Sequence, residues 1–158
     1  MLFWFVGTAV LSVRVVFGDS RFDYRFLVLG ALLPDVIDLP FGGARVLHSV
    51  VGSIAVLVVV MLSTVGRRLL RRRLLALPIG MMIHLIFDGA FTNNGVFWWP
   101  FSGFRFEDAP WPTWERGPWS ILLEVVGIGL CAWIVQRFGL RDADRRSRFV
   151  RTGILEPC

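Results

Sequence analysis

The chain has 158 residues, of which 55% are hydrophobic and 18% are charged, and its mean hydropathy is +0.63. This length suits one domain, and the composition excludes an ordinary soluble protein, because several stretches approach the roughly 17 to 20 apolar residues that cross a bilayer. The net charge of +5 comes from arginines grouped between or after the apolar stretches, so we interpret it as a topology signal and expect no nucleic-acid partner.

We therefore predict an all-α integral membrane protein with four transmembrane helices and one short or Pro-broken helical segment. The first span covers Leu2 to Phe17, and a polar connector follows it. The short segment runs from Phe26 to Pro40 and contains Pro34. Because proline removes a backbone donor, we expect Pro34 to break this segment and to open a new helical turn.

Three further spans complete the predicted bundle, with a basic loop and a connector rich in proline and tryptophan between them. In chain order these are the span Val46 to Val65, the loop Gly66 to Arg73, the span Leu74 to Phe91, the connector Thr92 to Pro118 and the span Trp119 to Phe138. Asn93-Asn94-Gly95 in the connector favours a turn. We predict one membrane-embedded domain, residues 1–138, and an Arg-rich tail, residues 139–158, at the membrane surface or disordered.

The arginines indicate an orientation in the membrane. The loop from Arg67 to Arg73 is expected in the cytoplasm under the positive-inside rule, and the Arg-rich tail falls on the same side because two spans separate them. The opposite side then carries Arg45, Arg105 and Arg116 together with a larger set of acids.

Five aspartate and histidine residues lie inside the apolar segments, where an ionised or polar group is costly unless it has a partner. They are Asp35, Asp38, His48, His84 and Asp88. On helices, Asp35 and Asp38 share a face at i, i+3, and His84 and Asp88 share one at i, i+4. The predicted orientation brings all five to one depth near the outer face, so we expect them to converge on one site.

Two imidazoles and several carboxylates suit a divalent metal ion. Zinc or manganese is favoured by the histidines, and magnesium is a further candidate. A catalytic site would keep one coordination position for water and lower its pKa. One of Asp35 and Asp38 would be a ligand and the other an orienting partner or general base, and the spacing leaves open which does which.

Other interpretations of the same residues stay open. The histidines can be hydrogen-bonded packing residues, Asp35 can cap the helical turn after Pro34, and the set can form a proton or ion relay. A serine nucleophile beside His48 is disfavoured because adjacent residues on a helix point in different directions. Arg45, Arg105 and Arg116 can hold a substrate phosphate, or they can simply face solvent and lipid headgroups.

Three blocks carry a resemblance to a known family. They are Leu33-Pro-Asp-Val-Ile-Asp38, Arg45-Val-Leu-His-Ser49 and His84-Leu-Ile-Phe-Asp88, followed by Trp99-Pro-Phe101. In this order they resemble the YdjM-like family of LexA-regulated inner-membrane metal-dependent hydrolases, over about half of the chain. Family members often carry a Thr-His pair near the N-terminus, whereas this chain has Thr8 without a histidine.

The resemblance implies a multi-span helical protein of a prokaryotic cytoplasmic membrane, with a metal site at the same five polar residues. The family is similar to zinc-dependent phospholipase C, so hydrolysis of a phosphoester or lipid substrate at the outer face is the expected activity, with membrane lipids as partners. The alternative is a non-enzymatic membrane protein, either an ion or proton relay or a structural stress-response component.

Overall fold

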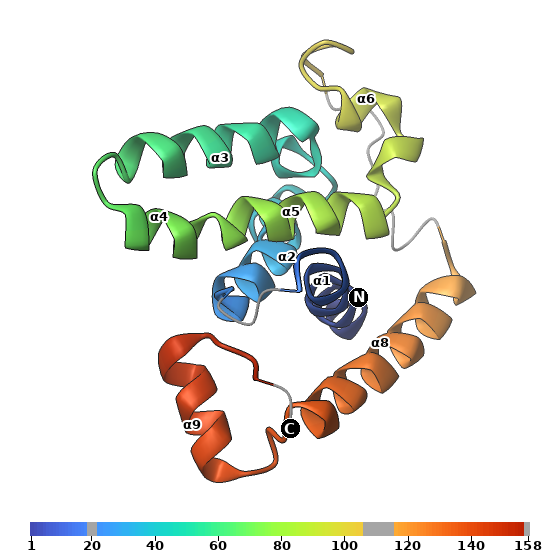
Figure 1. Cartoon of the computed structure of the whole chain (residues 1–158). Coiled ribbons are helices and arrows are strands. Elements are labelled where there is room, and N and C mark those ends of the chain that lie inside the picture. The colour runs from blue at the N-terminus through green and yellow to red at the C-terminus, as the bar shows by residue number, and fades with distance from the viewer. Residues whose placement is uncertain (19–21, 106–115, 157–158) are drawn as a thin grey trace.

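The computed structural model describes residues 1–18, 22–105 and 116–156. Within these ranges every regular element is helical, as predicted, and there is no strand (Figure 1). In chain order the elements are α1 (Leu2–Phe17), α2 (Tyr24–Asp38), η1 (Leu39–Phe41), η2 (Val46–His48), α3 (Val50–Ser63), α4 (Arg68–Leu74), α5 (Ala76–Phe87), η3 (Ala90–Thr92), α6 (Asn94–Phe97), α8 (Pro118–Arg137) and α9 (Ala143–Thr152).

Among the described helices, α8 is the one that is long and apolar enough to cross a membrane. The helices α1 and α3 are apolar but have 16 and 14 residues. At 1.5 Å per residue they are about 24 and 21 Å long, which is less than the ~30 Å of a bilayer core. The all-helical prediction is therefore confirmed, whereas four full transmembrane helices are not.

The predicted span from Val46 to Val65 is interrupted at Ser49. This residue is extended, with φ −102° and ψ 154°, and its side-chain oxygen accepts a hydrogen bond from the backbone N–H of Gly52. Serine is a preferred N-cap residue, so a new helix starts here rather than continuing from Val46. The prediction of one continuous span from Val46 is therefore wrong at its start, because His48 ends the separate turn η2.

Two segments predicted as loops are helical. The basic stretch after Gly66 forms α4, because arginine and leucine are strong helix formers. Arg71 of α4 donates to the backbone and side-chain oxygens of Thr64, at the end of α3. The predicted turn at Asn93 is instead the start of α6, where the Asn93 side chain caps the helix by accepting from Val96 N–H.

The helices α2 and α5 cross in backbone contact, because each has a glycine at the crossing. A Cβ atom on Gly30 would overlap the carbonyl group of Leu77, and one on Gly80 would overlap the carbonyl oxygen of Leu27. Glycine permits this approach because it has no side chain. The crossing fixes the C-terminal half of α5 against α2, and both helices contribute to the site described below.

A similar contact joins α1 to α8. The backbone of Trp4 lies against Gly127, and the carboxylate of Glu124 on α8 accepts hydrogen bonds from the backbone N–H groups of Leu2, Phe3 and Trp4 at 3.1, 3.2 and 3.3 Å. The first N–H groups of a helix have no partner within the helix, and a carboxylate is favourable at its positive end. Glu124 therefore fixes where α1 begins along α8.

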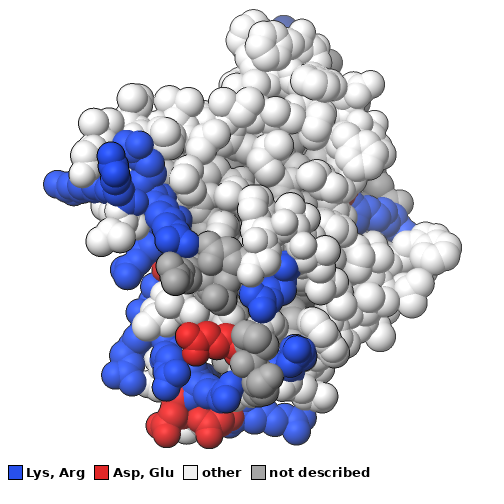
Figure 2. All heavy atoms as spheres, viewed as in Figure 1, with Lys and Arg blue, Asp and Glu red and all other residues white. Residues whose placement is uncertain are grey.

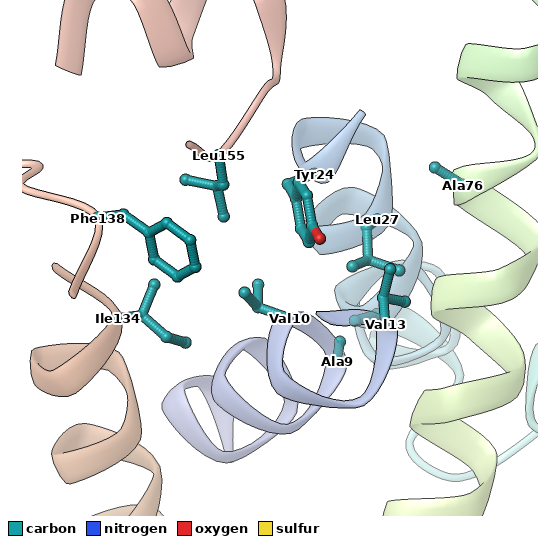
Figure 3. Packing of buried hydrophobic residues seen from close by; sticks show 10 residues of the cluster. Ala9, Val10, Val13, Tyr24, Leu27, Ala76, Ile134, Phe138 and Leu155 are labelled. Atoms are coloured by element: carbon teal, nitrogen blue, oxygen red, sulfur yellow. The ribbon is translucent and has the colours of Figure 1, made fainter. Parts of the chain in front are cut away.

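The Arg-rich tail folds back onto the helical bundle. Leu155, which follows α9, is buried together with Phe138 and Tyr24 (Figure 3). Arg25 pairs with Asp23 and also donates to the carbonyl oxygens of Val150 and Arg151 near the end of α9. At the start of α9, backbone N–H groups of residues 144 and 145 bind the Asp142 carboxylate and hold its pKa below the usual range. The tail is thus attached to the N-terminal end of α2.

Candidate metal centre

The last turns of α2 present Asp35 and Asp38 on one face, as their spacing predicts. Pro34 lies inside α2 and does not interrupt it, so the expected break at this residue is wrong. Asp38 is 2% exposed, whereas the Asp35 side chain is 31% exposed. The region around these two carboxylates is therefore accessible to a solute from the side of Asp35.

His48, fully buried at the end of η2, lies between the two carboxylates. Its Nδ1 atom is 2.7 Å from Oδ2 of Asp38, and its Nε2 atom is 3.4 Å from Oδ1 of Asp35. A carboxylate only accepts hydrogen bonds, so Nδ1 carries the proton that faces Asp38. The same Asp38 oxygen accepts the backbone N–H of Arg45 at 2.9 Å. Asp38 thus fixes both the ring and the loop that carries it.

His84, fully buried on α5, approaches Asp35 from the other side. Its Nδ1 atom lies 2.7 Å from the carbonyl oxygen of Ala31, which can only accept, so this nitrogen carries the proton. Its Nε2 atom lies 3.6 Å from Oδ1 of Asp35 and has no hydrogen-bond partner among the described residues. Phe5 packs on the ring with a centroid distance of 4.0 Å and closes that side.

These two histidines direct their Nε2 atoms at the same carboxylate oxygen. In the neutral rings, each of these nitrogens carries a lone pair, and two lone pairs facing an anionic oxygen repel unless a cation or proton lies between them. One oxygen of Asp35 and one nitrogen each of His48 and His84 lie within 4.8 Å of one another. This group of ligand atoms could hold a cation.

The spacing of these atoms fits a small divalent ion. Zinc binds nitrogen and oxygen at about 2.0 to 2.1 Å in a tetrahedral arrangement, which places neighbouring ligand atoms about 3.3 Å apart. The two distances from Asp35 Oδ1 to the imidazole nitrogens, 3.4 and 3.6 Å, are close to this value. Asp35, His48 and His84 could therefore hold one metal ion with little movement.

The other two predicted ligands lie outside this group. Asp38 contacts His48 through Nδ1, on the side of the ring that faces away from Asp35. Of the two roles that the sequence left open for Asp35 and Asp38, this position gives Asp38 that of the orienting partner. Asp88, at the C-terminal end of α5, accepts a hydrogen bond from Arg116 at 3.0 Å through Oδ1. Its Oδ2 atom is buried without a partner among the described residues. Three of the five predicted residues thus form the cluster. Of the other two, Asp38 binds the His48 ring and Asp88 binds Arg116.

The three arginines considered for substrate binding have different positions. Arg116 pairs with Asp88, and its side chain is 23% exposed. The Arg45 side chain turns back to the carbonyl oxygen of Phe41. Arg105 is exposed and lies at the end of the described range 22–105. Arg116 therefore lies beside Asp88, next to the site, and no sequence pattern indicated this pairing.

Comparison with known proteins adds no relative. No family model, no curated protein and no solved structure matches this chain. The resemblance to the YdjM-like family thus stays a prediction. The chemistry of Asp35, His48 and His84 is the basis for the function proposed below.

Proposed function

We propose that this protein is a membrane-bound metal-dependent hydrolase that acts on a phosphoester or lipid-type substrate. The observation that carries the proposal is the convergence of Asp35, His48 and His84 on one point, where the Nε2 atom of buried His84 has no hydrogen-bond partner in the described part of the chain. Zinc is the expected ion, because two imidazoles and one carboxylate are a common ligand set of catalytic zinc, while manganese and magnesium are alternatives.

Three protein ligands leave one coordination position of a tetrahedral ion for water or substrate. Such an ion, when bound, polarises a phosphoryl or carbonyl oxygen and lowers the pKa of a coordinated water. Asp35 is the exposed member of the set, so the open position is expected on its side. Hydrolysis of an ester bond is the chemistry that this arrangement favours.

The surrounding residues orient the ligands and the substrate. Asp38 holds the His48 ring through Nδ1, and the Ala31 carbonyl does the same for His84. Hydrogen bonds of this kind fix the tautomer and raise the basicity of a ligating imidazole. Arg116 is partly exposed and pairs with Asp88, which lies one helical turn beyond His84. A guanidinium in this position suits the negative charge of a phosphoryl group.

A membrane location is supported by the surface of the helices. The helix α8 can cross a bilayer by length and composition, and most of its side chains are not buried against the rest of the chain. Large apolar side chains are also exposed on α1 and α3, including Val15, Val59 and Leu62. Such a surface is typical of contact with lipid, which makes lipid phosphoesters an accessible class of substrate.

The position of the arginines supports the predicted orientation. The helix α4 precedes α5, whereas His84 lies in the C-terminal half of α5. The tail contacts the N-terminal end of α2, whereas Asp35 lies near its C-terminal end. The Arg-rich elements and the metal cluster are therefore at opposite ends of these helices, as expected for a site at the outer face and basic segments in the cytoplasm.

Hydrolysis of model phosphoesters tests this function. Purified full-length protein is assayed on phosphomonoesters, phosphodiesters and phospholipids after loading with zinc, manganese or magnesium. We expect activity that chelation removes, and that Asp35→Asn lowers at least 100-fold because the variant loses an anionic ligand. Asp144→Asn is the matched control, because it makes the same change on exposed α9 and should leave activity unaltered.

The non-enzymatic alternative makes a different prediction. The contacts Asp38–His48–Asp35–His84 also form a chain along which a proton can move. A relay would show proton flux in liposomes that needs these residues but no metal. Flux that persists after chelation, together with no hydrolysis under any metal, would replace the hydrolase proposal.

A further inference from the structure

The Arg-rich end of the molecule carries a second surface that the metal chemistry does not use. We call it the basic surface, and Figure 2 shows its arginines extending from the edge formed by α4 to the region of α9. Its exposed members are Arg67, Arg68, Arg72 and Arg73 at α4, and Arg141, Arg145, Arg146, Arg148 and Arg151 at α9.

Three of the arginines at α4 lack a carboxylate partner among the described residues. They are Arg67, Arg68 and Arg73. Arg71 is different, because its guanidinium turns inward to Thr64. A counter-charge from outside would therefore stabilise this part of the fold.

Apolar side chains are exposed among these arginines. Leu69 in α4 is 82% exposed, Val65 just before it is 69% exposed, and Val150 in α9 is 61% exposed. The combination of arginine and aliphatic side chains on short surface helices is typical of segments that lie in the headgroup region of a membrane.

We propose that the basic surface binds the anionic headgroups of phospholipids in the adjacent leaflet. Arginine binds phosphate through two parallel N–H donors, and juxtamembrane basic clusters are attracted to anionic lipid. The exposed leucine and valine side chains enter the interface between the headgroups. This inference rests on the proposed membrane location but not on metal-dependent hydrolysis, so either can fail alone.

Thermal unfolding in lipid nanodiscs tests the inference with the full chain. The midpoint is measured in phosphatidylcholine alone and in a mixture of phosphatidylcholine with phosphatidylglycerol. We expect a higher midpoint with phosphatidylglycerol, by about 2 to 4 °C for each arginine that gains a phosphate partner. The gain should shrink as salt is raised, because exposed charges are screened.

Variants of α4 identify the surface. In R67Q/R68Q/R73Q the gain should fall by more than half, whereas R67K/R68K/R73K keeps the charge and should retain most of it. R141Q/R146Q/R151Q should remove a further part. An equal gain in the wild type and in the glutamine variant of α4 would overturn the proposal, and so would no gain in the wild type. Equal stabilisation of the wild type by short duplex DNA would make the partner a nucleic acid and also overturn it.

Discussion

The Nδ1 atom of His84 donates a hydrogen bond to the carbonyl oxygen of Ala31 at 2.7 Å, across the crossing of α5 and α2. This bond leaves the lone pair of Nε2 directed at Asp35. It depends on the close approach of the two helices, which Gly30 and Gly80 permit. The site is thus set by a backbone contact as much as by its ligands.

Substitution Gly80→Ala should separate α2 from α5. The added Cβ would overlap the Leu27 carbonyl, and overpacking of this kind costs about 1 to 3 kcal/mol. We expect lower stability in denaturant unfolding and weaker metal binding, because His84 moves away from Asp35. Gly129→Ala is the control, since none of the described atoms lies within 4 Å of its Cβ position. Equal stability losses in both variants would contradict this account of the crossing.

Substitution Asp38→Ala should weaken metal binding without abolishing it. Asp38 holds the His48 ring, and loss of such an orienting carboxylate lowers metal affinity by about 10- to 100-fold. A zinc competition titration measures the dissociation constant. If Asp38→Ala removes binding as completely as Asp35→Asn does, Asp38 is itself a ligand. If it changes nothing, the His48 ring is fixed by other contacts.

Substitution Gly153→Ala should detach the tail from α2. Gly153 has φ 75°, where alanine is strained by about 1 kcal/mol, and the new Cβ would overlap the Asp23 carboxylate. We expect faster proteolysis of the α9 segment and a lower unfolding midpoint. Gly18→Ala is matched, because φ is 60° there and no atom of the described residues lies within 4 Å of its Cβ position. A tail equally protected in both variants would show that the contact with Asp23 is unimportant.

Much of the helical framework follows from hydrophobic patterning. The predicted first span, Leu2 to Phe17, coincides with α1, and the predicted last span differs from α8 by one residue at each end. The pattern failed at Ser49 and at the arginines after Gly66, because a capping side chain and helix propensity set helix boundaries without altering hydropathy. Apolar length alone therefore overestimated the number of full spans.

The candidate site was predictable in membership but not in detail. Asp35, His48 and His84 are conspicuous because they are polar residues in apolar segments, and the structure brings them together. Spacing alone did not separate Asp35 from Asp38, since both share one face of α2 and their roles depend on where η2 places His48. The pairing of Asp88 with Arg116 joins residues 28 apart across a connector, which no local pattern encodes.

The central claim is that Asp35, His48 and His84 hold one metal ion, and metal content tests it most directly. Full-length protein purified in detergent without chelators is analysed by elemental mass spectrometry beside Asp35→Asn, His84→Ala and the control Asp144→Asn. The account predicts about one zinc or manganese ion per chain in the wild type and the control, and near-complete loss in the two site variants. A wild type without metal after incubation with zinc, or site variants that keep it, would contradict the account.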